Sequence, residues 1–279
     1  MKKHLSTILF VLVFLIGLSI MLYPTVSDYI NSKNASRIIA DYEATLSQAS
    51  KEDISAWLDV ADEYNRKLAA TPSAFYDPDL IGGYNEALDI TGTGIMGYID
   101  IVKDKVNIHL PIYHGVDDVV LQIGVGHLPG TSLPVGGKST HCVLSGHTGL
   151  PSSRLFTDIY DLEIGDTFTV TVANQILTYQ VDQIKVVLPE ETDDLRIVEG
   201  MDYCTLFTCT PYGINSHRLL VRGVRINNIE SEEEARSTVY VANEAFKIDA
   251  VIVAPIIAAP MLLILLIVML ICDKIKKKH

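Results

Sequence analysis

The sequence predicts a mainly β domain held between two membrane-spanning helices, and two observations support this. Apolar residues are concentrated at both ends of the chain, where residues 5–23 and 250–272 carry no charged side chain. Between them, from about residue 97, short β-branched segments follow one another with few helical stretches, which is typical of a closed barrel or a sandwich. The mean hydropathy of +0.27 over 279 residues is therefore an average over two apolar ends and a polar middle.

The N-terminal apolar run predicts an uncleaved signal-anchor over residues 1–26. It follows Lys2 and Lys3 and ends at Tyr23 and Pro24, with no small-x-small cleavage site of the kind that a removable signal peptide needs. As a helix, residues 5–23 would be about 28 Å long, which matches the ~30 Å hydrocarbon core of a bilayer.

The C-terminal run predicts a second membrane-spanning helix over residues 250–272. A buried core helix is the alternative, but a long uncharged run followed by a lysine-rich tail (273–279) favours the membrane. Lysines flank the outer end of both runs. The positive-inside rule therefore places both termini in the cytoplasm and the middle of the chain outside the cell membrane.

The composition of the middle excludes several classes of protein. Residues 27–247 hold 32 acidic and 16 basic side chains, whereas a nucleic-acid-binding protein needs a basic surface to meet phosphates. Four cysteines in the whole chain are too sparse for a disulfide framework. No metal site is predicted, because neither a Cys-x-x-Cys pair nor a His-Glu-x-x-His pattern occurs.

The middle divides into a helical part and a β part. Residues 27–92 have helical spacing of apolar residues, interrupted at 71–83 by a loop rich in Pro, Gly and aromatic residues that we expect to lie over a surface. A β domain is predicted over 93–228, and a charged linker helix over 229–249. The expected strands are residues 98–101, 108–113, 141–144, 167–172, 176–187, 203–208 and 218–226, with a hairpin turn near 173–175.

Cys209 is the cysteine whose setting suggests a reactive thiol. It ends a predicted strand beside a loop, where side chains meet a cleft. Cys142 lies within an apolar predicted strand and is expected in the core. Cys204 lies five residues before Cys209 on one strand, so the two point to opposite faces and cannot easily form a disulfide. The setting alone leaves open whether Cys209 is a nucleophile or inert.

A cysteine nucleophile needs a histidine to manage its proton and a donor for the developing oxyanion. His147 directly follows a predicted strand, and glycines near it on both sides allow tight turns and close approach. Arg218 begins the strand after Cys209, and strands joined by a short loop are neighbours, so we expect Arg218 near Cys209. The remaining histidines are expected to be structural or surface groups: His109, His114, His127, His141 and His217.

These residues and their flanks resemble the sortases, the cysteine transpeptidases of Gram-positive bacterial surfaces, and in particular the pilus-assembling class C. Residues 205–209 read Thr-Leu-Phe-Thr-Cys, which is similar to the family's Thr-Leu-x-Thr-Cys, and 144–147 read Leu-Ser-Gly-His, like the catalytic histidine segment. Arg218, nine residues after the cysteine, matches the catalytic arginine. Residues 96–99, 110–115 and 126–134 also look like class C, so the resemblance covers roughly residues 27–270.

The resemblance implies an eight-stranded sortase β-barrel with Cys209 as nucleophile, His147 and Arg218 as catalytic partners, and no cofactor. Thr208 and Thr210, which flank the cysteine, are expected to support the substrate or the oxyanion.

Class C sortases also carry a lid over the active-site groove, often with the sequence Asp-Pro-aromatic. Here Asp77 and Pro78 with the preceding Tyr76 would form the lid, but Asp79 stands where the aromatic residue is expected. Asp77 would pair with Arg218, and Tyr76 or a neighbouring apolar residue would have to cover Cys209.

The function implied is cleavage of a Leu-Pro-x-Thr-Gly-like (LPXTG-like) sorting signal between Thr and Gly, followed by transfer of the acyl group to a lysine of a pilin subunit. The expected partners are such pilins and the lipid bilayer. Three alternatives stay open: a housekeeping sortase acting on cell-wall peptidoglycan precursor, a hydrolytic cysteine protease, and a non-enzymatic membrane-tethered adhesin or assembly protein.

Overall fold

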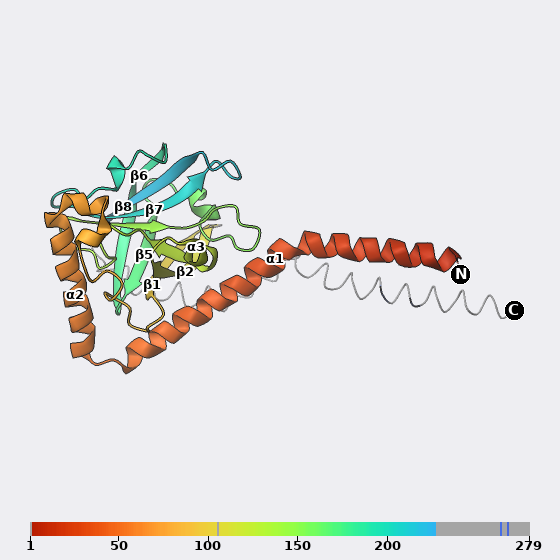
Figure 1. Cartoon of the computed structure of the whole chain (residues 1–279), viewed down its shortest axis with the longest axis horizontal. Helices are drawn as coiled ribbons and strands as arrows, with labels where there is room; N and C mark the ends of the chain where they lie inside the picture. Colours follow the sequence, from red (N-terminus) through yellow and green to blue (C-terminus); the bar gives the residue numbers. More distant parts are fainter. Residues whose placement is uncertain (1, 105, 227–262, 264–266, 268–279) are drawn as a thin grey trace.

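A computed structural model of the chain describes residues 2–104 and 106–226, together with residues 263 and 267. Its centre is a closed barrel of eight strands in the order β1-β2-β3-β4-β7-β8-β6-β5, so the barrel prediction is confirmed and the sandwich alternative is not (Figure 1). The strands are β1 (Ile95–Lys103), β2 (Val106–His114), β3 (Val125–His127), β4 (Thr140–Ser145), β5 (Thr167–Val172), β6 (Gln175–Val187), β7 (Asp202–Thr210) and β8 (His217–Arg225).

The barrel is mixed, because β2 pairs in parallel with β3 and β4 in parallel with β7, while its other pairs are antiparallel. Parallel neighbours need a crossover between them, and the segment from β4 to β7 supplies one with the β5–β6 hairpin. The sequence pattern missed β3 and the short helix α3 (Asp118–Ile123). Each is too short to show a period.

Two helices precede the barrel. α1 (Lys2–Gln48) is one continuous helix, with Pro24 inside it. It therefore crosses the boundary at residue 26 between the predicted anchor (1–26) and the predicted helical region (27–92). α2 (Lys51–Ala70) begins with a capping box in which Ser50 and Asp53 satisfy each other's backbone N–H groups. Figure 1 shows the helices meeting at one corner, with the N-terminal part of α1 projecting far from the barrel.

Within the described residues, one helix is long and apolar enough to cross a membrane, and it is α1 from Val11 onward. Its side chains between residues 12 and 16 are largely exposed, which suggests a membrane anchor because such an apolar surface needs a cover. The predicted linker helix (229–249), and all but two residues of the predicted second span (250–272), lie outside the described residues, as does the tail.

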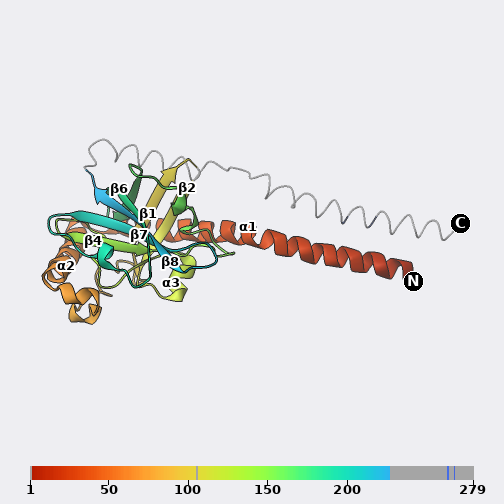
Figure 2. The ribbon, with the colours of Figure 1, turned by 90° about the horizontal axis from the view of Figure 1, so that it is seen from above.

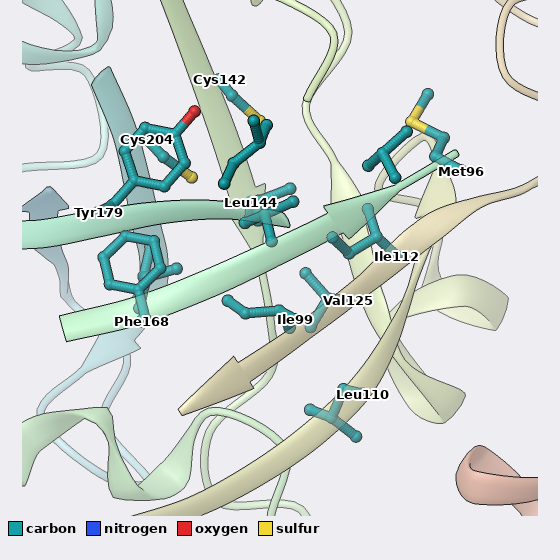
Figure 3. Packing of buried hydrophobic residues seen from close by; sticks show 14 of the residues in the cluster. Met96, Ile99, Leu110, Ile112, Val125, Cys142, Leu144, Phe168, Tyr179 and Cys204 are labelled. Atoms are coloured by element: carbon teal, nitrogen blue, oxygen red, sulfur yellow. The ribbon is translucent and has the colours of Figure 1, made fainter. Parts of the chain in front are cut away.

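The barrel interior is filled by apolar side chains from nearly all of its strands. Figure 3 shows Leu144, Phe168 and Tyr179 pointing inward, and the last two stack at a centroid distance of 5.6 Å. Cys142 and Cys204 lie among them, which confirms the core position predicted for Cys142. A fully packed interior leaves no internal channel, so the chemistry of the molecule must lie at a rim or on the outer surface.

α1 packs on the barrel through one stripe of buried residues: Ala35, Ile39, Tyr42 and Leu46. Tyr42 is the polar member, and burial raises the pKa of its hydroxyl to about 12. The hydroxyl donates to the carbonyl of Met96 on β1 at 2.8 Å and accepts from the N–H of Ala173, in the β5–β6 turn, at 3.0 Å. One side chain therefore ties the helix to two parts of the barrel.

We expect Tyr42→Phe to lower the free energy of unfolding by about 1–3 kcal/mol, because two buried backbone groups lose their partner. Urea unfolding of the full-length protein in detergent measures it. The control is Tyr29→Phe, which changes an exposed side chain of the same helix. Equal midpoints for the two variants would contradict the structural role of Tyr42.

Candidate active site

Cys209 and Arg218 are brought together by the antiparallel pairing of β7 with β8. They are direct register partners, one residue from the end of each strand. Residues opposite each other in an antiparallel pair project to the same face with Cβ atoms about 5 Å apart. Both side chains are half-buried, and the Arg218 guanidinium donates to the carbonyls of Asn215 and His217 at 3.0 Å, which fixes its orientation.

His147 reaches the same end of the barrel from β4. In the parallel pair of β4 and β7, Ser145 is the partner of Phe207, and each catalytic candidate lies two residues further along its own chain. The Gly146 N–H donates to the Phe207 carbonyl at 3.0 Å, which extends the pairing beyond the strand. This register places half-buried His147 beside Cys209.

Thr208 stabilises the placement of His147 beside Cys209. Its hydroxyl is buried and donates to the carbonyl of Gly146 at 2.7 Å, so the residue before the cysteine is bonded to the residue before the histidine. Gly146 has no room for a side chain, since a Cβ there would lie 2.5 Å from the ring of Phe156. The buried ring of Phe156 therefore supports the backbone that carries His147.

Thr210, predicted together with Thr208 as support for the substrate, is buried at the last residue of β7 and pairs with His217. The role of Thr210 in supporting the substrate therefore stays a prediction. For Thr208, the bond to Gly146 gives a structural reason for a threonine that the sequence pattern alone could not supply.

Tyr160 is a residue of this site that the sequence pattern missed. It lies on the 3-10 helix η3 (Thr157–Asp161), and its hydroxyl donates to the carbonyl of Cys209 at 2.9 Å. Tyr212, in the β7–β8 turn, packs its ring against Gly149, two residues after His147. Both tyrosines are partly or largely exposed, so they line the edges of the His147–Cys209 site. No local motif marks them, since each acts through a contact with a distant segment.

The other cysteines and histidines of the described barrel have structural settings, as predicted for Cys142 and the histidines. Burial raises the pKa of the Cys204 thiol well above its ordinary value, which keeps it a neutral core group. Burial also lowers the pKa of His141 to about 4, while its ring nitrogens bond to Arg196 and Thr205. His127 is fully buried against Tyr84 and Ser132.

Three further histidines each have a backbone or side-chain hydrogen-bond partner. His109 bonds to Asp100, and His114 bonds to the carbonyls of Gly94 and Ala87. His217 bonds to its neighbour Ser216.

The predicted lid loop (71–83) lies against the barrel as two short 3-10 turns, η1 (Pro72–Phe75) and η2 (Pro78–Leu80). Phe75 packs on a cluster that includes Phe207, which projects from the same face of β7 as Cys209. The loop rests on Gly130, where a Cβ would lie 2.8 Å from the Phe75 carbonyl oxygen.

Arg196 holds the lid loop from the other side. Its guanidinium carbon lies 4.8 Å from the ring centroid of Tyr76 and 5.6 Å from that of Phe75, both within cation–π range. The guanidinium also donates to the Tyr76 hydroxyl. Beside these contacts the loop and the barrel enclose a cavity of about 530 Å³, lined in part by Thr71 and Leu195.

The structure does not bring Asp77 to Arg218. Both residues are described, Asp77 is exposed, and the two form no ion pair. Pro78 begins η2 and is half-buried. In this arrangement Arg196, rather than Arg218, is the arginine that contacts the lid loop, through an aromatic side chain instead of a carboxylate.

Across the described residues, no group of three or more His, Cys, Asp or Glu side chains is placed to hold a metal ion. The site consists of a thiol, an imidazole and a guanidinium, the groups needed for nucleophilic attack, proton transfer and oxyanion stabilisation.

Comparison with known proteins identifies the class of protein. Residues 101–226 match the Sortase domain family. Sortase D of Bacillus subtilis is 29% identical over 125 residues, which are 44% of this chain and 60% of that protein. Sortase A of Streptococcus agalactiae is 30% identical over 113 residues, 39% of this chain and 45% of that protein. The chain thus spans less than two thirds of the length of these two relatives.

Solved structures give a closer match. Sortase C1 of Streptococcus agalactiae is 49% identical with a TM-score of 0.63, covering 69% of this chain and 99% of that one. Sortase C of Clostridium perfringens, solved with the C-terminal cell wall sorting motif, is 43% identical with a TM-score of 0.59, covering 69% and 100%. Sortase C of Streptococcus pneumoniae is 40% identical with a TM-score of 0.61, covering 68% and 97%.

The chain belongs to the sortase family of cysteine transpeptidases. The class C resemblance drawn from the sequence is confirmed by these structures, which are all class C enzymes.

We expect Thr208→Val to slow the alkylation of Cys209 by iodoacetamide by about tenfold at neutral pH. Without the hydroxyl the His147 segment is no longer fixed beside the cysteine, and poorly positioned groups lose catalytic effect steeply. Thr208→Ser keeps the hydroxyl and is expected to restore the rate. Mass spectrometry of the Cys209 peptide over time measures it, and equal rates for Val and Ser would refute the positioning role.

Proposed function

We propose that the protein is a membrane-anchored class C sortase that cleaves an LPXTG-like sorting signal between Thr and Gly and joins the new acyl group to a lysine of a pilin subunit. The observation that carries the proposal is the pairing of Cys209 with Arg218 across β7 and β8, with His147 at the end of the neighbouring β4. The barrel around them is 40–49% identical to class C sortases.

In the first half of the reaction the Cys209 thiolate attacks the carbonyl carbon of the substrate threonine. The carbonyl oxygen becomes an oxyanion, and Arg218, oriented by its bonds to the β7–β8 turn, donates hydrogen bonds to it. His147 in its protonated form gives a proton to the glycine nitrogen as the Thr–Gly bond breaks. The products are a thioester on Cys209 and a free amino terminus on glycine.

In the second half a lysine amine attacks the thioester carbonyl. The neutral imidazole of His147 takes the proton that the amine loses, and the C–S bond breaks to release the Cys209 thiolate. The new bond is an isopeptide, and no cofactor is required. Water competes with the amine at the thioester stage, so the site must limit the access of water.

The related structures support the choice of substrate. The Clostridium perfringens enzyme was solved with the C-terminal cell wall sorting motif, and the Streptococcus pneumoniae structure is described as informing pilin substrate specificity. A pilin with such a motif and an acceptor lysine is the substrate class that we assign to this chain by analogy.

The proposed placement has the barrel outside the cell, between two cytoplasmic ends. The exposed apolar part of α1 supports the first anchor, over residues 1–26. The uncharged run 250–272 and the lysines after it support a second anchor on the sequence alone. We retain residues 27–92 as the helical and lid region, 93–228 as the catalytic barrel and 229–249 as the linker.

The experiment that tests the function is incubation of the full-length protein in vesicles with a purified pilin that carries the motif. We expect a ladder of covalent polymers with the wild type and none with Cys209→Ala. Arg218→Lys keeps the charge but loses the planar donor pair, so we expect the rate of polymer formation to fall at least ~10²-fold. Transfer to a peptidoglycan amine in place of the pilin lysine would indicate a housekeeping sortase, and release by water alone would indicate a protease.

We further propose that residues 71–83 form a lid held by Arg196. Arg196→Ala removes the contacts to Phe75 and Tyr76, so we expect bulky thiol reagents to modify Cys209 several-fold faster. Asp77→Ala, which removes no ion pair to Arg218, is expected to have the smaller effect. Stopped-flow labelling with Arg66→Ala as an exposed control measures the three rates. If Asp77→Ala raises the labelling rate of Cys209 more than Arg196→Ala does, an ion pair between Asp77 and Arg218 would be favoured instead.

A further inference from the structure

Two polar side chains of α1 hold the loop that follows His147. The carboxylate of Asp28 accepts from the backbone N–H of Arg154 at 2.7 Å, and the amide of Asn31 donates to the carbonyl of Ser152 at 2.9 Å. Asp28 and Asn31 are three residues apart, so they share one face of the helix, and both are half-buried. We name these two contacts the α1 clasp.

The clasp is connected to the catalytic histidine through a short, closed loop. Two residues after Arg154, the N–H of Phe156 donates to the carbonyl of His147 at 3.0 Å. The N–H of Gly149 donates to the Thr157 hydroxyl at 3.2 Å, which closes the loop a second time. The loop is therefore hydrogen-bonded to itself at its base and to α1 at its tip.

The arginine of the clasp is itself fixed. The Arg154 guanidinium forms a two-point ion pair with Asp158, and Asp158 is the main cause that raises its pKa, with smaller contributions from Asp28 and Asp161. Three carboxylates therefore lie near one guanidinium, and the backbone N–H of the same arginine is bonded to Asp28.

The clasp lies close to the membrane if α1 is the anchor. Asp28 is five residues after Tyr23, the last residue of the predicted apolar run, and a helix rises about 1.5 Å per residue, so the offset is about 7.5 Å. The polar headgroup layer adds roughly 5–8 Å on each side of the hydrocarbon core. Apolar side chains continue to this height and are exposed on the structure: Val26, Tyr29 and Ile30.

Figures 1 and 2 show from two directions how the β7–β8 turn lies relative to the N-terminal half of α1. In both views the turn between β7 and β8 points to the side from which the N-terminal half of α1 leaves the barrel. That turn follows Cys209 directly, since β7 ends at Thr210. The end of the barrel that carries the site therefore faces along the helix toward the membrane.

We propose that Asp28 and Asn31 are positioning residues, which bond the His147 loop to the juxtamembrane turn of α1 and so hold the active site at a fixed height just above the bilayer. This rests on the proposed function and on α1 as the anchor.

The first test uses the full-length protein in vesicles with matched variants of α1. Asn31→Asp is nearly isosteric but replaces the donor by an acceptor, and Asp28→Ala removes the other contact. Asp28→Asn keeps an acceptor oxygen and is the rescue variant. Asn34→Asp makes the same chemical change as Asn31→Asp at an exposed position of the helix and is the control.

Two readouts are measured on each variant. In Asn31→Asp and Asp28→Ala we expect amide hydrogen exchange over residues 147–156 to be about tenfold faster. We also expect kcat on a soluble LPXTG-like peptide to fall about tenfold, with KM nearly unchanged, because the loop positions a catalytic group and does not bind the peptide. Asp28→Asn and Asn34→Asp should resemble the wild type in both. If either readout stays at the wild-type value in both disrupting variants, the proposal is wrong.

The second test measures the height of the site. An LPXTG-like peptide is joined at its C-terminal end to a phospholipid through spacers of increasing length, and cleavage is measured in vesicles. Inserting seven helix-forming residues after Val26 keeps the face of the helix but raises the barrel by about 10.5 Å. We expect the best spacer to lengthen by about three extended residues, at roughly 3.3–3.6 Å each. An unchanged spacer optimum would overturn the height assignment.

Failure of this inference can be told apart from failure of the proposed function. Hydrogen exchange needs no catalysis, and the wild-type preparation is assayed for the Cys209 thioester by mass spectrometry. No thioester in the wild type would contradict the function while the exchange result still tests the clasp. A thioester with no effect of the variants would contradict the clasp alone.

Discussion

The parallel pairing of β4 with β7 is the constraint on which the rest of the site depends. It aligns the ends of two strands that are about sixty residues apart in the sequence, so that His147 and Cys209 leave the barrel side by side. Antiparallel pairing of β7 with β8 then adds Arg218. Backbone hydrogen bonds are strong and directional, so a register of this kind positions three side chains through the backbone.

The segment that carries His147 is held on three sides by different parts of the fold. Thr208 bonds to its backbone from β7, the buried ring of Phe156 fills the space against Gly146, and α1 bonds to the following loop through Asp28 and Asn31. A proton-transfer group must stay within hydrogen-bond reach of its target, and the three supports serve that need. The long N-terminal helix therefore also contacts the loop that follows His147.

The region around residues 71–83 departs from the pattern that the family resemblance implied. Asp79 replaces the expected aromatic residue, and Asp77 forms no ion pair with Arg218. The loop is nevertheless bonded to the barrel, because Arg196 contacts Tyr76 and Phe75 packs near Phe207. A cation–π contact replaces an ion pair as the attachment, which leaves Arg218 bonded to backbone carbonyls of its own turn.

The sequence by itself determined the apolar N-terminal helix, most of the barrel strands, the core position of Cys142, and the candidates Cys209, His147 and Arg218. Each of these has a local signal, such as a run, an alternation or a motif. Only the tertiary structure decided the brief strand β3, the contact of Tyr160 with the Cys209 carbonyl, the Arg196 attachment and the α1 clasp. These depend on segments that meet only after the barrel closes, and spacing along the chain does not encode which distant groups will meet.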